Sequence, residues 1–283
     1  MQTIGILGLG IIGTGIAKHI EQLGHSVIVW NRTPQSGWNH YAHTPGDVAQ
    51  QSKIIALYLK DRNACLEVFN QLRPALTPEH TIINHSTIDL ATCMKLAQEC
   101  QAIGCTYVDA PFTGSKNPAA QGQLVYYVGT DETTLARIKP ILELSSKAIV
   151  PTGPIGSATV LKLVTNMISA SMVQVLSEAL AITNAYGMDA DLLLEAMENN
   201  VVISPLAKFK LPFMQEKDFG THFSLDNMRK DGTYALELAA DKGIIPPSCQ
   251  LVSSIMTRLC AEGKADLDFS CLASQFEEQN KSL

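Results

Sequence analysis

Hydrophobic and polar positions change their spacing regularly along the first half of the chain. Short β-branched runs that are apolar on both faces predict strands at Thr3–Leu7, Val27–Trp30, Ile54–Leu59, Thr81–Asn84, Thr106–Asp109 and Leu124–Val128. Runs with apolar residues every three to four positions predict helices between them, at Ile11–Leu23, Arg62–Leu72, Leu90–Ile103 and Glu132–Leu142. Strands that alternate with helices in this way predict an α/β fold with a doubly wound parallel sheet, covered by helices on both faces.

The pattern changes after Pro151, where glycine and proline interrupt the chain. One long helical pattern then runs from Ala158 to about Tyr186 and ends before Gly187, a residue suited to helix termination. Shorter helices are predicted at Asp191–Asn199, Pro205–Gln215, Ser224–Lys242 and Gln250–Glu262. No strand is predicted after Val150. We therefore expect two domains, residues 1–157 and an all-α domain of residues 158–283, connected by the long interdomain helix.

Composition narrows the class of protein. Of the 283 residues, 46% are hydrophobic and 17% are charged, which predicts a large folded core. The net charge of −6 argues against nucleic acid and anionic membranes as partners. The seven cysteines show no CxxC spacing and no cluster with histidine, so we expect free thiols in the cytoplasm and no metal site. Polar residues interrupt the apolar stretch 160–182, which predicts a buried helix and not a membrane span.

A glycine-rich turn follows the first predicted strand. Gly8, Gly10 and Gly13 form a complete GxGxxG, with Ile11 and Ile12 opening a helix and a second strand following at Val27–Trp30. In this context the first glycine permits a tight turn, the second lets backbone approach a pyrophosphate, and the third lets helix and strand pack closely. The first domain is therefore predicted to be a Rossmann-like dinucleotide-binding domain.

The end of the second strand indicates which dinucleotide is bound. Proteins that bind NAD usually place a carboxylate here to hold the ribose 2′-hydroxyl. This chain instead has Asn31, Arg32 and Thr33, whose side chains can pair with or donate to a 2′-phosphate. The sequence therefore favours NADP(H) as the cofactor.

Two later segments carry side chains suited to a small substrate with a carboxylate. The segment 109–124 is rich in hydroxyl and backbone N–H groups, and it fits a carboxylate-binding loop as well as an ordinary crossover loop. Lys162 and Asn166 share one face of the long helix among apolar neighbours. A partly desolvated lysine suits proton donation to an alkoxide, although a lysine that merely covers apolar surface is common. Lys230 and Asp231, on a later helix, would by themselves be a solvated pair.

Four blocks in order, GLGIIGTGIA with NRT, DAPFTGSKNPAAQGQL, GSATVLKLVTN and FSLDNMRKD, carry a family resemblance over nearly the whole chain. The chain resembles the β-hydroxyacid dehydrogenases, which include 3-hydroxyisobutyrate dehydrogenase and the glyoxylate/succinic semialdehyde reductases. The GSKxPAxxGxL portion is most similar to the latter branch. The resemblance implies that Lys162 is catalytic, and that Asn166 helps to hold the substrate.

The resemblance also implies binding roles for the remaining matched residues. To the cofactor residues already predicted from the glycine turn and the end of the second strand, Gly8, Gly10, Ile11, Ile12, Gly13, Asn31, Arg32 and Thr33, it adds Leu59, Lys60, Thr87 and Lys230. It assigns to the substrate Ser86, Thr113, Gly114, Ser115 and Asp231. The chain departs from the family pattern at Thr113, usually serine, at Ala158, usually glycine, and at Phe112, usually smaller. The last two departures concern the shape of the substrate pocket.

The sequence thus predicts NADPH-dependent reduction of a small aldehyde- or keto-acid, with hydride from the cofactor and a proton from Lys162. The alternatives are NAD(P)-dependent oxidation of a 3-hydroxy acid of the 3-hydroxyisobutyrate type, and a non-catalytic NADP-binding scaffold. Imine reduction is disfavoured because relatives with that activity usually lack the lysine. The long helix is apolar over much of its circumference, which predicts a homodimer or homotetramer.

Overall fold

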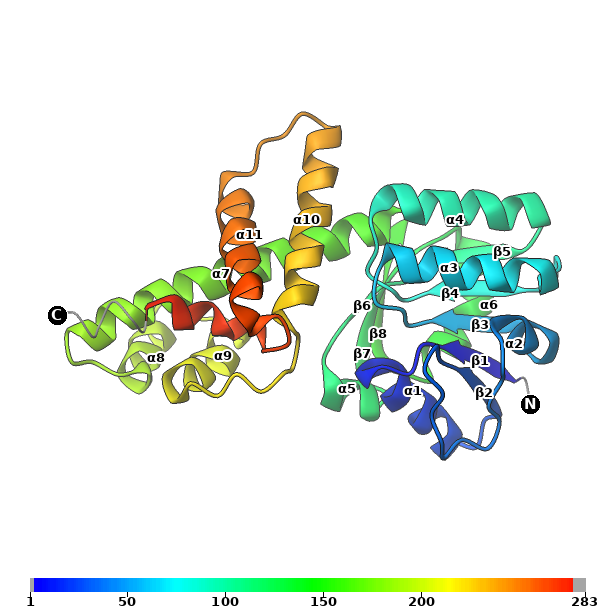
Figure 1. Cartoon of the computed structure of the whole chain (residues 1–283), viewed down its shortest axis with the longest axis horizontal. Helices are drawn as coiled ribbons and strands as arrows, with labels where there is room; N and C mark the ends of the chain where they lie inside the picture. The colour runs from blue at the N-terminus through cyan, green and yellow to red at the C-terminus, as the bar shows by residue number, and fades with distance from the viewer. Residues whose placement is uncertain (1–2, 277–283) are drawn as a thin grey trace. The chain divides into compact units, whose positions relative to one another are not determined.

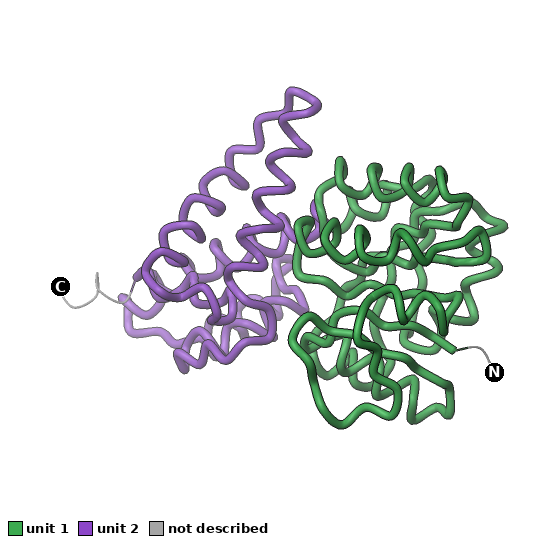
Figure 2. Tube along the Cα trace, turned by 45° about the vertical axis from the view of Figure 1, so that its right-hand side comes forward, with its two compact units in different colours: residues 1–162 green, residues 163–283 purple. Residues whose placement is uncertain are grey.

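The structure is a computed structural model that describes residues 3–276. It divides into two compact units, residues 1–162 and residues 163–283 (Figure 2). The division falls within the long helix α7 (Ser157–Ala185), whereas the sequence pattern places a domain boundary after residue 157.

The first unit is built on a single twisted sheet (Figure 1). Its strands are β1 (Ile4–Leu7), β2 (Val27–Trp30), β3 (Ile54–Leu57), β4 (Thr81–Asn84), β5 (Thr106–Asp109), β6 (Phe112–Thr113), β7 (Leu124–Gly129) and β8 (Ser146–Gly153). They lie in the order β2-β1-β3-β4-β5-β7-β6, with β8 pairing beside β7. The first five strands are parallel, as their mainly apolar and buried sequences predict.

Helices cover both faces of this sheet, so the predicted doubly wound fold is confirmed. The helices are α1 (Ile11–Gln22), α2 (Pro45–Gln51), α3 (Arg62–Leu72), α4 (Leu90–Ile103), α5 (Lys116–Ala120) and α6 (Glu132–Leu142), with a 3-10 turn at Arg73–Ala75. One apolar core contains Val48, Phe69 and Leu96 from α2, α3 and α4. The other contains Ile16 from α1 and Ile138 from α6.

The sheet is not parallel throughout. Strand β7 is antiparallel to β5 and β6, while β8 is parallel to β7. The sequence pattern predicted no strand in the segment Ser146–Gly153 and none after Val150, and this was wrong because β8 occupies that whole segment. Pro151 suggested a break, but β8 pairs only with β7, and an edge strand tolerates the missing N–H of a proline. Helix α2 was also missed, although Thr44 and Asp47 form a complete capping box there.

The second unit consists of helices packed around one apolar core. They are most of α7, then α8 (Ala190–Glu198), α9 (Pro205–Glu216), α10 (Leu225–Asp241) and α11 (Pro247–Leu259), followed by a π turn at Cys260–Lys264 and a 3-10 helix at Phe269–Phe276. Asp189, Ser204 and Ser224 begin α8, α9 and α10 as side-chain N-caps. Between residues 163 and 276 there is no β-ladder beyond one isolated bridge, which agrees with the predicted all-α domain.

Helix α7 is the single helix in the described part of the chain that is long and apolar enough to cross a bilayer by composition. Its most apolar window is 44% buried inside the protein, and the polar residues Lys162, Asn166 and Gln174 on it are themselves buried. Such a helix contributes to a protein core, as its interrupted sequence predicts.

Candidate cofactor and substrate site

The glycine turn joins β1 to α1 at the carboxyl end of the sheet. Strand β1 lies between β2 and β3, so the chain leaves β1 on one side and returns on the other. Doubly wound sheets bind ligands at such a reversal point. Gly8 has a φ of +99°, and a Cβ there would collide with the carbonyl of Tyr58, while a Cβ on Gly13 would collide with the carbonyl of Gly8. The close approach of backbone to backbone therefore requires both glycines.

Gly10 differs from these two glycines. It is the N-cap of α1, makes no side-chain cap, and a Cβ there would meet nothing within 4 Å. The next residue, Ile11, is 54% exposed, and Ile12 is half-buried. The N–H groups at a helix N-terminus favour an anion, and the open space over Gly10 fits the backbone approach of a pyrophosphate. The turn thus fits a dinucleotide.

Asn31 braces the glycine turn from the end of β2. Its Oδ1 accepts a hydrogen bond from Leu9 N at 3.0 Å, and its Nδ2 donates to Thr33 O at 2.9 Å. The amide is therefore engaged within the protein, a function that the sequence did not reveal. Arg32 and Thr33 are exposed beside it. They are the side chains in this segment with the freedom to approach a phosphate.

Leu59 and Ser86 link the ends of β3 and β4. Leu59 N donates to Ser86 Oγ at 2.8 Å, and Ser86 Oγ in turn donates to Leu57 O at 3.3 Å. Ser86 is 4% exposed, whereas Lys60 is exposed and Thr87 half-buried. The structure therefore brings together the two loops that were predicted to pass the cofactor, and it shows that Ser86 fixes one loop to the other.

A buried aromatic group lies next to these strand ends. The His85 ring stacks on Tyr58 at 4.6 Å and lies 4.5 Å from Tyr126 between ring centroids. Tyr126 Oη lies within 2.8 Å of both Tyr58 Oη and Ser145 Oγ. Burial lowers the pKa of His85 to about 4, although its Nδ1 hydrogen bond to Ala110 O opposes this effect. Sequence reasoning missed this group because its members come from four separate segments.

The segment predicted to bind a carboxylate is partly ordered into regular structure. Thr113 lies in β6, opposite Val125 of β7, and Ser115 precedes the short helix α5. Thr113 and Gly114 are exposed, and Ser115 is half-buried. Gly114 has a φ of +133°, a conformation that a residue with a side chain rarely adopts. Glycine therefore permits the sharp change of direction between β6 and α5.

Lys162 lies on α7 with an exposed fraction of 8%. Its Nζ is 5.9 Å from the centroid of the Phe112 ring, within the range of a cation–π contact. Phe112 in turn lies 6.1 Å from Tyr58 between ring centroids. Phe112, one of the three departures from the family pattern, is therefore a direct neighbour of the predicted catalytic lysine.

In the second unit, three predicted site residues form one connected group. Asn166, 8% exposed, donates from Nδ2 to Asp231 Oδ2 at 2.6 Å. Lys230 Nζ lies 2.8 Å from Asp231 Oδ1 and 5.1 Å from the centroid of the Tyr234 ring. Asp231 is 1% exposed and Lys230 is half-buried, so the pair expected to be solvated from sequence chemistry alone is largely shielded from solvent. Asp231 holds the side chains of Asn166 and Lys230.

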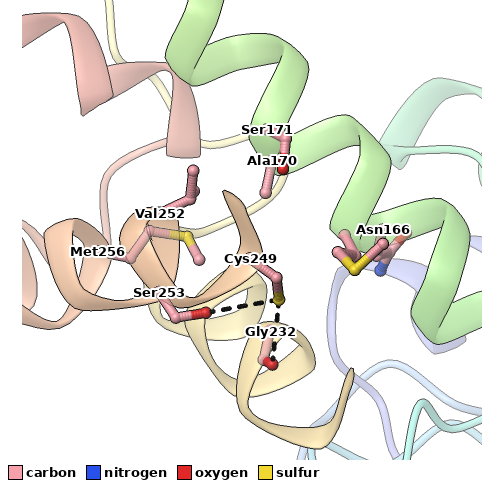
Figure 3. A pocket seen from close by; sticks show the side chains of 9 residues that line it. Asn166, Ala170, Ser171, Gly232, Cys249, Val252, Ser253 and Met256 are labelled. Carbon is pink, nitrogen blue, oxygen red and sulfur yellow. Dashed lines mark hydrogen bonds between the residues drawn. The ribbon is translucent and has the colours of Figure 1, made fainter. Parts of the chain in front are cut away.

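A narrow crevice lies beside this group, between α7, α10 and α11 (Figure 3). Cys249 Sγ donates there to Gly232 O at 3.9 Å and lies 4.0 Å from Ser253 Oγ. A Cβ on Gly232 would lie 2.8 Å from Ser253 Oγ, so this glycine lets α11 approach α10. The crevice admits no water-sized molecule.

Comparison with known proteins agrees with this geometry. Residues 3–153 match the family described as the NAD binding domain of 6-phosphogluconate dehydrogenase, and residues 156–275 match that described as NAD-binding of NADP-dependent 3-hydroxyisobutyrate dehydrogenase. Two Arabidopsis thaliana proteins, glyoxylate/succinic semialdehyde reductases 1 and 2, are each 28% identical over 95% of this chain, and the alignments cover 96% and 78% of their lengths. The chain belongs to the β-hydroxyacid dehydrogenase family.

The solved structure of 3-hydroxyisobutyrate dehydrogenase from Mycobacterium tuberculosis with L-serine shares this fold, with a TM-score of 0.90 at 24% identity. That alignment covers 97% of this chain and 99% of the other. As a β-hydroxyacid dehydrogenase, the protein is an oxidoreductase that acts on CH–OH groups with a nicotinamide cofactor. The resemblance inferred from the four sequence blocks is confirmed.

The cysteines and the candidate metal ligands of this dehydrogenase form no metal centre among the residues that the structure describes. The seven cysteines are free thiols, six of them buried. Among residues 3–276, no group of three or more His, Cys, Asp and Glu side chains is placed to hold a metal ion.

Proposed function

We propose that this enzyme reduces a small aldehyde- or keto-acid, of the glyoxylate or succinic semialdehyde type, to the hydroxy acid with NADPH. The observation that carries the proposal is the buried Lys162, which shares a face of α7 with Asn166. The two Arabidopsis reductases, at 28% identity over nearly the whole chain, support this substrate class.

Lys162 is the proposed proton donor. As an ammonium it protonates the carbonyl oxygen and stabilises the negative charge that develops there. An ionised carboxylate only accepts hydrogen bonds, so Asp231 holds the Nδ2 end of Asn166. Asn166 Oδ1 is then the end that can accept from an ammonium or from a substrate hydroxyl. Asp231 is thus better suited to orient Asn166 than to bind the substrate directly.

The remaining binding roles follow the family pattern. When bound, the nicotinamide cofactor supplies a hydride to the carbonyl carbon. The glycine turn, Leu59, Lys60, Thr87 and Lys230 are proposed to hold it, with Arg32 and Thr33 at the 2′-phosphate. The Thr113–Ser115 segment is proposed to bind the substrate carboxylate, and Ser86 is proposed to line the substrate site.

The second candidate is oxidation of a 3-hydroxy acid of the 3-hydroxyisobutyrate type. The match of residues 156–275 to a family described by that dehydrogenase supports it. A panel of small carbonyl acids and hydroxy acids, assayed in both directions with NADP(H) and NAD(H), separates the two candidates. We expect the highest kcat/KM for a carbonyl acid with NADPH. A higher value for a 3-hydroxy acid with NAD⁺ would reject the proposal.

Lys162→Ala tests the assigned proton donor. We expect kcat to fall at least about 100-fold, within the usual contribution of acid–base catalysis, with the Kd for NADPH within about twofold. Lys208→Ala, at an exposed lysine of α9 paired with Glu198, is the matched control and should retain full activity. Full turnover in Lys162→Ala would exclude this mechanism.

Arg32→Ala should raise KM for NADPH about tenfold and leave KM for NADH nearly unchanged.

We also propose that α7 binds a second copy of the chain. Leu161, Ile168, Val175 and Ile182 recur every seven residues, and they are 43%, 49%, 62% and 60% exposed. A seven-residue apolar repeat along one helix is the pattern that packs against another helix. Val175→Glu should lower the molar mass measured by light scattering to that of a monomer. Val201→Glu, outside this repeat and 98% exposed, should leave the mass unchanged.

A further inference from the structure

The carboxylate of Asp109 connects the end of β5 to the first turn of α7. Its Oδ2 accepts hydrogen bonds from Gly156 N at 3.0 Å and from Thr159 N at 2.9 Å. Its Oδ1 accepts one from Thr159 Oγ1 at 2.8 Å. Asp109 is 1% exposed, so this is a buried carboxylate with three donors. The interaction joins residues about fifty positions apart, all within the first unit.

This arrangement is a helix cap supplied from a distant strand. The first N–H groups of any α-helix lack partners within the helix, and a carboxylate there satisfies them and stabilises the positive end of the helix dipole. Two of the three donors are backbone N–H groups, which only donate, so Oδ2 carries no proton in this geometry. Burial raises the pKa of Asp109, and the hydrogen bonds from Thr159 and Gly156 counteract that rise.

The neighbouring strand is shaped to make room for this carboxylate. Gly129 of β7 pairs directly with Asp109. A Cβ on Gly129 would lie 2.8 Å from Pro154 O, 3.1 Å from Ser157 Oγ and 3.3 Å from Asp109 Oδ2. The absence of a side chain at this position therefore permits β5, β7 and the start of α7 to meet.

The capped turn lies directly next to the proposed proton donor. Thr159, Lys162 and Asn166 stand at positions i, i+3 and i+7, which share one face of a helix. They are polar and 2%, 8% and 8% exposed. Asp109 also precedes the Thr113–Ser115 segment by only a few residues. One side chain therefore connects the start of that segment to the turn that carries Lys162.

We propose that Asp109 is a positioning residue for the reaction: through Thr159 it fixes the start of α7 and thereby the place of the Lys162 ammonium relative to the Thr113–Ser115 segment. The inference rests on the proposed function, since it concerns the same lysine. Acid–base catalysis requires the reacting groups within hydrogen-bond reach, and a misplacement of about 1 Å can cost about 100-fold in rate.

The test uses a pair of substitutions at Thr159 in the full-length enzyme. Thr159→Val removes the hydroxyl that Asp109 holds and keeps the shape of the side chain, whereas Thr159→Ser keeps the hydroxyl. We expect Thr159→Val to lower kcat about tenfold with KM for the carbonyl acid and Kd for NADPH within about twofold. Thr159→Ser should restore kcat to within about twofold of the wild type. Thr183→Val, at another hydroxyl of α7 that bonds to Ala179 O, is the matched control.

Two further measurements distinguish positioning from a merely structural cap. Hydrogen–deuterium exchange of the peptide spanning residues 155–163 should be faster in Thr159→Val than in Thr159→Ser or Thr183→Val. The primary isotope effect with deuterated NADPH should rise in Thr159→Val, because the chemical step becomes slower relative to binding and release. Asp109→Asn, which keeps one oxygen for the two N–H groups, should lower kcat less than Thr159→Val.

Wild-type kcat and isotope effect in Thr159→Val would overturn the proposal, as would an equal loss of kcat in Thr183→Val. In either case the proposed function is still supported if Lys162→Ala is inactive. Full turnover in Lys162→Ala removes the proposed function first, so the two failures are distinguishable.

Discussion

His85 should make the first unit less stable as the pH falls below neutrality. Its ring is 3% exposed between Tyr58 and Tyr126, and burial lowers the pKa of the folded protein's His85 to about 4. The ordinary pKa of histidine is about 6.5, so between pH 4 and 6.5 the unfolded chain binds the proton that the folded chain excludes. Stability from neutral His85 is therefore complete above about pH 6.5 and is lost as the pH falls towards 4.

The magnitude follows from the difference between the two pKa values. A difference of about 2.5 pH units between the two pKa values corresponds to a loss of about 3 kcal/mol once the pH is well below 4. At pH 5 the same two values give a loss of about 2 kcal/mol relative to pH 8. Other groups titrate in this range, so the quantity to compare is the difference between a variant and the wild type at each pH.

His85→Gln removes the titration and keeps an N–H donor for Ala110 O. The assay is urea unfolding of the cofactor-free protein from pH 5 to 8, followed by tryptophan fluorescence. Both tryptophans, Trp30 and Trp38, lie in the first unit and report its unfolding. The variant should be less stable than the wild type at pH 8, because it loses the stacking of the His85 ring. Between pH 8 and pH 5 the wild type should lose about 2 kcal/mol more of its free energy of unfolding than the variant loses.

The control is His40→Gln, at an exposed histidine of the same unit, which should run parallel to the wild type across the pH range. Parallel curves for His85→Gln and the wild type would refute the reasoning, because they would mean that folding does not change the proton affinity of His85.

Three further outcomes are expected. Gly10→Ala should fold with wild-type stability but bind NADPH at least about tenfold more weakly, because a Cβ at Gly10 meets no protein atom. Gly13→Ala should lower the free energy of unfolding, because a Cβ at Gly13 collides with the backbone of Gly8. Lys210 Nζ lies 2.6 Å from Oδ1 of Asp268, which is 1% exposed, so Lys210→Met leaves a buried carboxylate without its cation. We expect the substitution to lower the free energy of unfolding by about 3–5 kcal/mol, measured by urea unfolding followed by circular dichroism. Phe112→Val should raise kcat/KM for branched carbonyl acids about tenfold relative to unbranched ones; an unchanged ratio would show that Phe112 does not shape the pocket.

Local features of the sequence determined the fold class. The alternation of β-branched runs with helical patterns predicted the parallel strands β1–β5 and the helices α1, α3, α4 and α6, because burial on both faces of a sheet leaves a continuous apolar signal. The GxGxxG turn was recognisable because steric demands on Gly8 and Gly13 act over a few residues. Helix α7 and the all-α second unit followed from apolar periodicity in the same way.

The details of the sheet edge were not determined locally. The antiparallel direction of β7, the short strand β6 and the extension of β8 past Pro151 depend on which strands become neighbours. No periodicity within these segments specifies a partner or a direction, and a proline signals an interruption unless the strand is known to lie at an edge.

Which side chains hold the candidate site in place was decided by tertiary structure alone. Lys162 and Asn166 could be placed on one helix face from sequence, because four residues make about one turn. The hydrogen bonds that Thr159 donates to Asp109 and that Asn166 donates to Asp231 join positions 50 and 65 residues apart, and they exist only because folding brings those segments together. The sequence by itself thus determined the chemistry available to this dehydrogenase, and the three-dimensional path of the chain decided which buried groups orient it.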